Sequence, residues 1–226
     1  MTTIKKHAVD DSLYISYLVA ATECGIIYVI DHANNKIIAK FKIPSTPYQL
    51  ITVGAFDVDY RIHVLTRENI IYTFKNGELQ NSTIEVCQKV IGMVRTEKSI
   101  IVATINSSLY AYHVTGKKNF TLQFPAPIVC IETMEIRQSL KNFRGYFISL
   151  RNGEVRTYNE KVLLHVFKYS ENITAMKFGK FGPEDNCLIM LSESGTLIVK
   201  SLVKYLVLEV GFNNLVYIIY PSSKIS

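Results

Sequence analysis

The chain has 226 residues, of which 48% are hydrophobic and 19% are charged. This composition is typical of a chain that folds around a core, and it excludes a disordered segment or a highly charged tail. The 25 basic and 19 acidic side chains give a formal net charge of +6, but the basic residues occur singly or in pairs such as Lys5-Lys6. Because a nucleic-acid footprint needs clustered positive charge, the sequence predicts no nucleic-acid partner.

The first predicted elements are two strands joined by a turn at Gly25. An apolar run, Tyr17 to Ala21, precedes this turn, and a β-branched run, Ile26 to Ile30, follows it. This pattern is typical of a β-hairpin. The hairpin recurs in altered form at intervals of about 40 residues, which indicates an internal repeat. The later turn residues are taken as Asn69, Ser108, Gly153 and Gly195.

Each hairpin is predicted to form the middle of a four-stranded unit. The first unit is expected to have the strands Thr2–Val9, Tyr14–Thr22, Gly25–Asp31 and Ile37–Ile43. The five units in chain order cover residues 2–43, 48–86, 90–124, 128–167 and 173–202. The fifth unit has no obvious final strand, and residues 203–226 form a divergent hydrophobic tail. Within this tail, Tyr205–Val210 and Leu215–Tyr220 have an irregular version of the hairpin pattern and could pair with each other.

The repeat of four strands, without a helical pattern of useful length, predicts an all-β fold. We expect a β-propeller with about five four-stranded blades. The apolar run Cys187–Leu191 fits a strand that neighbouring blades cover on both faces. A β-sandwich of the same length is the alternative, whereas a WD40 propeller is disfavoured because the chain has no tryptophan. An arc of five blades would leave apolar faces uncovered, so we expect part of a larger wheel.

The four cysteines are scattered along the chain, and no two of them have the spacing of a metal or redox motif. Such cysteines are more often buried and reduced than paired in disulfides, which favours a reducing compartment. They are Cys24, Cys87, Cys130 and Cys187.

The sequence predicts no catalytic centre, metal or cofactor. The five histidines, at positions 7, 32, 63, 113 and 165, are spread over four of the five units without the spacing of metal ligands. Phe56–Asp59 carries alternating carboxylates but lacks the further oxygen ligands of a calcium loop, so we assign it to a hairpin turn. No glycine-rich phosphate loop or serine nucleophile motif is present.

Several strings, in this order, closely resemble the propeller of the Bardet–Biedl syndrome 1 protein family, whose members are subunits of the ciliary coat complex called the BBSome. The resemblance extends from Met1 to about Leu202, and its most specific string is Phe178–Asn186. The other strings are Leu18–Glu23, Ile43–Pro47, Gly54–Arg61 and Asn152–Tyr158. The family has a seven-bladed propeller, and the resemblance implies that this chain starts at the third blade.

The resemblance implies a non-enzymatic scaffold or adaptor that acts in cilium assembly and in the traffic of membrane proteins to and from cilia. The implied partners are other BBSome subunits, ciliary membrane-protein cargo and the GTP-bound form of an ARF-like small GTPase, with only indirect membrane contact. The implied locations are the cytoplasm, the cilium, its basal body and, peripherally, its membrane. The GTPase site is expected where the first and last blades of the wheel meet. Only the last of these is expected in this chain, so the site is expected to be incomplete, and the residues nominated for it are Lys177, Lys180, Glu184 and Asp185.

Two alternatives stay open. The run Gly25–Asp31 also resembles the blade motif of quinone-dependent alcohol dehydrogenases. Those enzymes dock their blades through tryptophans, which this chain lacks. The other alternative is a general protein-interaction module of the propeller type.

Overall fold

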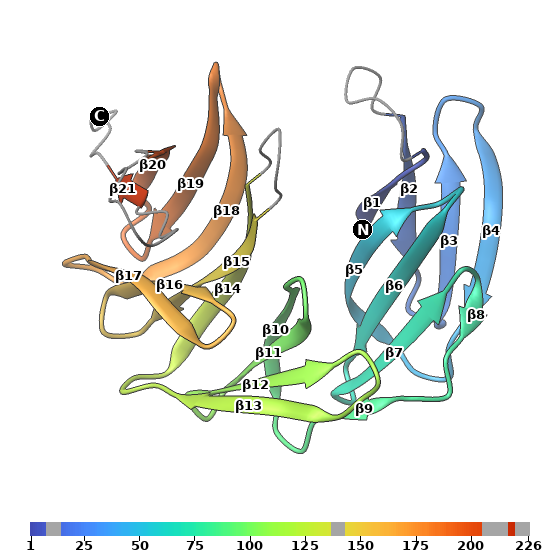
Figure 1. The fold of residues 1–226 in the computed structure, drawn as a ribbon, viewed down its shortest axis with the longest axis horizontal. Helices are drawn as coiled ribbons and strands as arrows, with labels where there is room; N and C mark the ends of the chain where they lie inside the picture. The colour runs from blue at the N-terminus through green and yellow to red at the C-terminus, as the bar shows by residue number, and fades with distance from the viewer. Residues whose placement is uncertain (8–14, 137–142, 205–216, 220–226) are drawn as a thin grey trace, which may run out of the picture. The chain divides into compact units, whose positions relative to one another are not determined.

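The computed structural model describes residues 1–7, 15–136, 143–204 and 217–219, and all of its regular elements are β-strands (Figure 1). In this part of the chain, no helix is long and apolar enough to span a membrane. The residues divide into two compact units, which are described separately: Met1–Met93 with Tyr112–Lys118, and Val94–Ala111 with Asn119–Ser226.

The first unit contains a nine-stranded sheet in which two blades are joined. The strand order is β4-β3-β2-β1-β5-β6-β7-β8, and β9 also pairs with β7. The strands are β1 (Thr2–Lys5), β2 (Ser16–Ala21), β3 (Ile26–Asp31), β4 (Lys36–Lys42), β5 (Pro47–Ala55), β6 (Asp59–Thr66), β7 (Ile70–Lys75), β8 (Glu78–Leu79) and β9 (Ile84–Glu85).

The two blades are joined by the parallel pair β1 and β5, in which Lys5 lies opposite Ala55. The amide of Phe56 donates to the carbonyl of Lys5 at 2.8 Å, and the amide of Asp57 donates to the carbonyl of Lys6 at 3.1 Å. The strand β1 therefore has backbone partners on both sides, since it also pairs antiparallel with β2.

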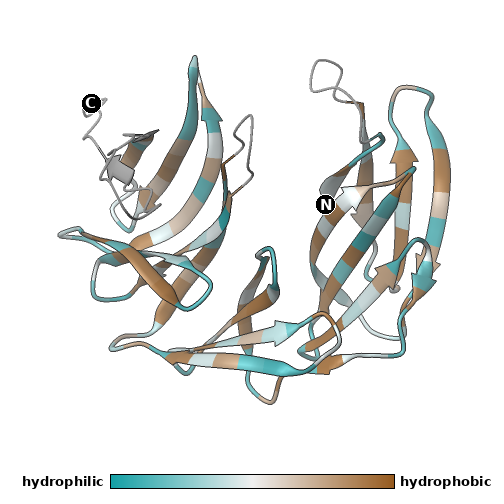
Figure 2. Cartoon of the chain, in the orientation of Figure 1, coloured by the Kyte–Doolittle hydropathy of each residue, from teal (hydrophilic) through white to brown (hydrophobic). Residues whose placement is uncertain are grey.

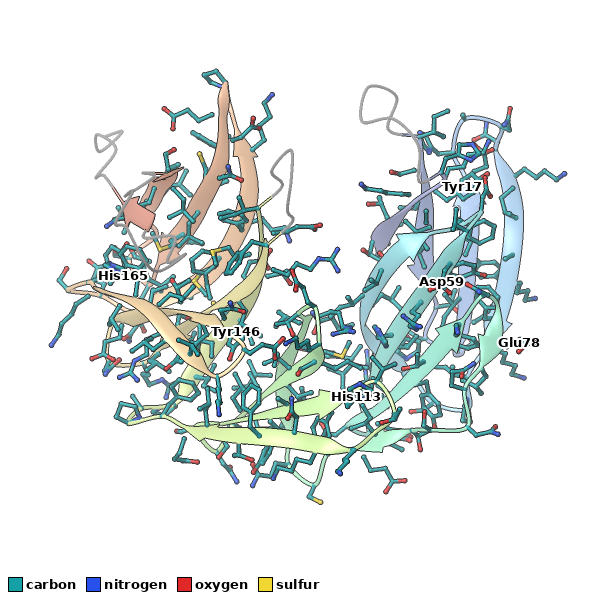
Figure 3. All side chains as sticks on the ribbon, in the orientation of Figure 1. Tyr17, Asp59, Glu78, His113, Tyr146 and His165 are labelled. Atoms are coloured by element: carbon teal, nitrogen blue, oxygen red, sulfur yellow. The ribbon has the colours of Figure 1, made fainter. Side chains whose placement is uncertain are left out.

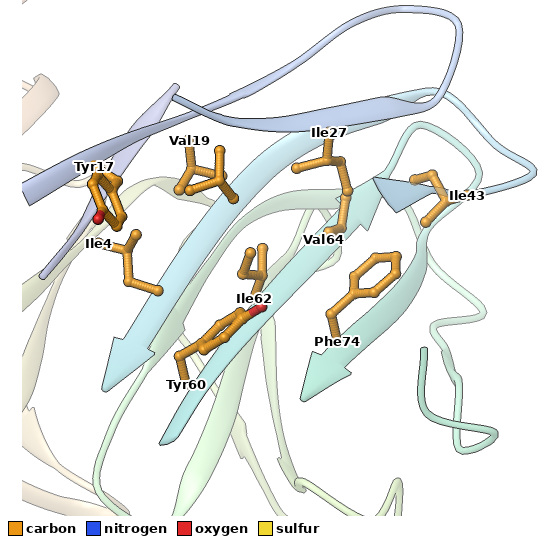
Figure 4. Close-up of a cluster of buried hydrophobic side chains, with 10 residues drawn as sticks. Ile4, Tyr17, Val19, Ile27, Ile43, Tyr60, Ile62, Val64 and Phe74 are labelled. Carbon is orange, nitrogen blue, oxygen red and sulfur yellow. The ribbon is translucent and has the colours of Figure 1, made fainter. Parts of the chain in front are cut away.

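The core of the first unit lies between these two blades (Figure 4). Its side chains come from alternate positions of the strands, because successive residues of a strand point to opposite faces. Phe56 extends the core, with its ring edge-on to Tyr17 and stacked on Tyr60. The buried cluster consists of Ile4, Tyr17, Val19, Ile27, Val29, Ile43, Tyr60, Ile62, Val64 and Phe74.

Three four-stranded sheets follow along the chain, and each keeps its strands in sequence order. The third blade has β10 (Val90–Arg95), β11 (Ser99–Thr104), β12 (Ser108–His113) and β13 (Lys118–Gln123). The fourth has β14 (Ile128–Ile136), β15 (Phe143–Leu150), β16 (Glu154–Asn159) and β17 (Val162–Lys168). The fifth has β18 (Ile173–Phe181), β19 (Glu184–Ser192), β20 (Leu197–Lys204) and β21 (Tyr217–Ile219).

The final strand of the fifth sheet comes from the segment that the sequence analysis placed in the tail. The backbone of β21 pairs antiparallel with β20, with Leu202 opposite Ile219. The other half of the expected hairpin, 205–210, lies outside the described residues. The division into a propeller part, 1–202, and a tail, 203–226, stays a prediction.

One backbone turn recurs between the second and third strands of the sheets. Its central residue has a positive φ, and its carbonyl accepts a hydrogen bond from the amide that follows the fourth strand of the same sheet. The pairs are Ile43 to Gly25, Val86 to Asn69, Phe124 to Ser107 and Tyr169 to Gly153. Gly195 has the same positive φ in the fifth sheet.

This turn corrects one prediction from the sequence. The repeat residue of the third blade is Ser107, with a φ of 57°, and not Ser108. Ser108 is already the first residue of β12, and its hydroxyl donates to the side chain of Gln123. Serine carries no signal for the left-handed region comparable to that of glycine or asparagine, so two adjacent serines gave an ambiguous alignment.

The second strands of the third and fourth sheets are covered on both faces, but the run Cys187–Leu191, for which this was predicted, is covered on one face only, because Leu191 is 40% exposed. All six residues of β11 are buried, as are the last six of β15. By contrast, the expectation of buried cysteines is wrong for two positions. Cys187 is buried and Cys130 is half-buried, but Cys24 and Cys87 are exposed, and all four are free thiols.

A carboxylate links the third and fourth blades within the second unit. Glu160, in the turn between β16 and β17, accepts a hydrogen bond from the Thr96 hydroxyl at 2.5 Å and one from the Lys98 amide at 3.4 Å. The phenol of Tyr146, labelled in Figure 3, donates to the backbone carbonyl of Glu160 at 2.5 Å. Burial raises the pKa of Tyr146, so this phenol stays protonated and remains a donor.

Replacing Glu160 with alanine is therefore expected to lower the free energy of unfolding by about 1–2 kcal/mol, because the Lys98 amide loses its acceptor and the Thr96 hydroxyl keeps only the Ser99 carbonyl. Urea denaturation of the full chain measures this loss. Glu78→Ala, at an exposed residue of β8, is the control and should stay within about 0.5 kcal/mol of the parent. Equal effects of the two substitutions would contradict the role of the Glu160 carboxylate.

Candidate protein interface

The nominated residues lie on the hairpin formed by β18 and β19 at one edge of the fifth sheet (Figure 1). Phe181 pairs with Glu184 across the turn Gly182-Pro183. Gly182 adopts a φ of 60°, a conformation that glycine reaches without a steric penalty. The two strands are nine residues long each, so the turn extends past the buried part of the sheet.

Three of the four nominated residues gather at the tip of this hairpin. Lys180, Glu184 and Asp185 are all exposed there, on either side of the turn. Phe181, which is 38% exposed, follows Lys180 in β18 and pairs with Glu184 across the turn. An exposed aromatic ring with charged groups beside it is typical of a protein-binding surface, in which the aromatic side chain anchors and the charges orient the partner.

The fourth nominated residue, Lys177, lies further along β18, opposite Ile189. Its ammonium group is 2.8 Å from a carboxylate oxygen of Glu132, which belongs to β14 of the fourth sheet. The Lys177 side chain is 76% exposed and that of Glu132 only 18%. Since one partner is well solvated, the pair contributes little stability, and Lys177 stays accessible from the hairpin side.

The fifth sheet has one covered face and one open face. Its covered face packs on the fourth sheet through Met176, Leu188 and Met190, which contact Phe147 and Val155 in one buried cluster. On its open face, Leu191 pairs with Leu197, and these side chains are 40% and 52% exposed. Ile189 and Val199 form the next pair on the same face and are half-buried.

The exposure of Leu197 is unusual for its place in the repeat. Leu197 stands two residues after the positive-φ residue of the turn, and the equivalent residues of the other four blades are completely buried. These residues are Ile27, Ile71, Leu109 and Val155. The hairpin tip and this open face together make up the candidate interface, which is defined by Lys177, Lys180, Phe181, Glu184, Asp185, Ile189, Leu191, Leu197 and Val199.

The polar side chains considered below form hydrogen bonds within turns and between strands. In the part of the chain that the structure describes, no group of three His, Cys, Asp or Glu side chains could hold a metal ion. His63 is buried and bonded to Thr73, and His113 bonds to Thr115 in a turn. The predicted turn at Phe56–Asp59 is confirmed, because it joins β5 to β6.

Comparison with known proteins identifies the fold. The family model for ciliary BBSome complex subunit 1 matches residues 1–75. "BBSome complex member BBS1" from Mus musculus and from Homo sapiens are each 35% identical to this chain over 212 residues, which is 93% of the chain. Crystal structures of BBS1N in complex with ARL6DN, soaked with mercury or with lead, superpose with TM-scores of 0.82 and 0.84 at 35% identity. The chain belongs to the BBS1 family.

The superpositions cover 92% of this chain and confirm the predicted β-propeller fold. They cover 62% and 63% of the two BBS1N chains. The chain spans 35% of the length of the mouse and human BBS1 proteins.

Sequence reasoning nominated the charges of the hairpin and missed its apolar residues. A usable signal was present, because Phe181 interrupts a run of glycines and charged residues that is otherwise typical of a solvated turn. The open face gave no such signal. Leu191 and Leu197 have the pattern of core residues, and only the packing of the sheets shows that they are exposed.

Proposed function

We propose that this chain is the propeller part of a non-enzymatic BBSome scaffold or adaptor, and that it takes part in binding the GTP-bound form of an ARF-like small GTPase. The supporting observation is the superposition on BBS1N from a complex with ARL6DN, at a TM-score of 0.82 over 92% of the chain. The proposal includes a role in cilium assembly and in carrying membrane proteins to and from cilia. It places the protein in the cytoplasm, the cilium and the basal body, and peripherally at the ciliary membrane.

We assign this contact to the candidate interface on the fifth sheet. Phe181 and the exposed leucines supply apolar area that a partner can cover, and burial of such area contributes about 25 cal/mol per Å². Lys180, Glu184 and Asp185 supply mixed charge at the rim, which sets orientation and rejects mismatched surfaces. Lys177 extends this rim along β18.

The experiment is a pull-down of purified full-length chain with ARL6 loaded with a non-hydrolysable GTP analogue or with GDP. We expect at least about tenfold more ARL6 retained in the GTP-analogue form, since the proposed contact depends on the nucleotide state. Equal retention in both states would refute the GTPase assignment. BBSome subunits from a ciliated-cell lysate should be retained in the same assay, and their absence would refute the scaffold assignment.

Lys180→Glu tests whether the candidate interface is the surface that binds the GTPase, separately from whether the chain binds it at all. It places a third carboxylate beside Glu184 and Asp185, and we expect it to lower the affinity for the GTP-loaded GTPase by about tenfold or more. Lys42→Glu, at an exposed lysine of β4, is the matched charge reversal and should change nothing. Nucleotide-dependent binding that survives Lys180→Glu would keep the function and refute the assigned surface.

A further inference from the structure

The outermost strand of the fourth sheet, β17, combines a free backbone edge with exposed apolar side chains (Figures 1 and 2). Within the described residues, β16 is the only strand that pairs with it. Four of its seven residues are large, apolar and exposed. They are Val162, Leu163, Leu164 and Val166, with exposed fractions of 57%, 46%, 42% and 39%.

A β-bulge in the pairing of β16 with β17 brings these apolar side chains together. The register between β16 and β17 shifts at Thr157 and Tyr158, where Leu164 is the extra residue. Because a β-bulge interrupts the alternation of faces, Leu163 and Leu164 do not divide between the two faces as neighbours in a regular strand do. The apolar surface is therefore larger than an ordinary outer strand would present.

The outer strands β4 and β13 carry polar or charged residues that oppose unwanted pairing, and the centre of β17 does not. Lysines at positions 36, 40 and 42 interrupt the apolar residues of β4, and the exposed residues of β13 are all polar. Lysine on an edge strand is a common device against edge-to-edge association. Between the ends of β17 the one titratable residue is His165, labelled in Figure 3, which packs against the ring of Phe167. Burial of its ring, with Lys200 nearby, lowers the pKa of His165, so the strand carries no charge there at neutral pH.

The charges at the two ends of β17 indicate what binds there. Lys161 and Lys168 are exposed at either end, and neither forms an ion pair with any residue that the structure describes. The nearby carboxylates are already engaged: Glu154, which lies opposite Lys168 in the ladder and is weakly attracted to it, is held by the guanidinium of Arg156 at 2.7 Å, and one oxygen of Glu160 accepts from Thr96. In an antiparallel pairing with a second copy of this chain, each lysine would face the opposite lysine, which disfavours a symmetric dimer.

We propose that β17 is a strand-addition site for an extended segment of a partner protein, apolar in its centre and acidic at its ends. Such a segment would continue the fourth sheet through backbone hydrogen bonds, cover the four apolar side chains and place its carboxylates near the two lysines. This site is independent of the candidate interface on the fifth sheet and of the proposed GTPase contact.

The probe for this proposal is a fluorescent peptide of alternating valine and threonine with two glutamates at each end. Its binding to the full-length chain is followed by fluorescence anisotropy, and we expect saturable binding. The same peptide with alternate backbone amides methylated keeps its side chains but loses donors, so it should bind at least about tenfold more weakly. A version with lysines at its ends should be weakened to a similar extent, because it faces Lys161 and Lys168.

Variants locate the site. The double substitution Leu163→Lys, Val166→Lys gives β17 the protection that β4 already has, and it should lower the affinity for the acidic peptide at least about tenfold. Ile37→Lys, at a residue of β4 that is 56% exposed, is the matched control and should leave binding unchanged. Circular dichroism checks that each variant is folded.

Three outcomes would overturn the proposal. The first is no binding of the acidic peptide, and the second is binding that backbone methylation or the β17 double variant does not weaken. The third is a concentration-dependent dimer in light scattering that the double variant abolishes, since the occupant of β17 would then be a second copy of this chain.

Discussion

Replacing Met190 with arginine is expected to destabilise the chain by several kcal/mol, enough to remove cooperative unfolding. Met190 is completely buried in β19 and packs in the cluster shared by the fourth and fifth sheets. A guanidinium at this position has no acidic partner in the cluster and would lie unpaired in an apolar core. A burial penalty of this kind is comparable to the whole stability of a domain of ordinary size. The measurement is urea denaturation, together with the soluble yield.

The control is the neighbouring residue of the same strand. Leu191 points to the open face and is 40% exposed, so Leu191→Arg keeps its charge in water. We expect this variant to unfold within about 1 kcal/mol of the parent. If Met190→Arg gave soluble protein with a parent-like transition, the assignment of β19 to the core between the two sheets would be wrong.

Gly153→Ala is expected to have the second largest effect, about 3 kcal/mol. Gly153 has a φ of +79°, where an L-residue costs about 1–2 kcal/mol. In addition, a Cβ at this position would lie 2.4 Å from the carbonyl oxygen of Tyr169. The turn would have to open, which weakens the hydrogen bond of 2.9 Å from the Tyr169 amide to the Gly153 carbonyl. Urea denaturation measures the loss.

Gly195→Ala separates the two contributions. Gly195 occupies the same turn of the fifth sheet with a φ of +88°, but an added Cβ would meet no atom within 4 Å. The only remaining cost is that of the positive φ at an alanine, so we expect the free energy of unfolding to fall by about 1 kcal/mol. Similar losses for the two glycine variants would show that backbone conformation, and not the contact with Tyr169, sets the cost.

The repeat could be predicted from the sequence because its signals are local. A glycine or asparagine at the turn, with apolar β-branched residues on both sides, is enough to place a hairpin, and this held at Gly25, Asn69 and Gly153. The prediction was off by one residue at Ser107, where no such residue marks the turn. The strand β21 lies inside the predicted strand Leu215–Tyr220, but its pairing with β20 as the final strand of the fifth sheet was not predicted.

The candidate interface was less predictable, because its apolar part depends on what a sheet packs against. Val155 and Leu197 occupy equivalent positions in successive blades, and both have the pattern of core residues. The first is completely buried and the second is 52% exposed. No local property of either sequence separates them, since the difference arises from the neighbouring sheet. The exposed edge of β17 is similar, because Val162–Val166 has the composition of a central strand.

The parallel pairing of β1 with β5 also determines how the first two blades come apart. A blade that packs on its neighbour through side chains alone can open by separating two surfaces, but here the ladder crosses from one blade to the next. Local opening of either blade must break main-chain bonds that hold the other, so the two should exchange their amide hydrogens as a single cooperative unit. Both blades therefore depend on the strand Thr2–Lys5, and a substitution that disrupts it would destabilise both of them.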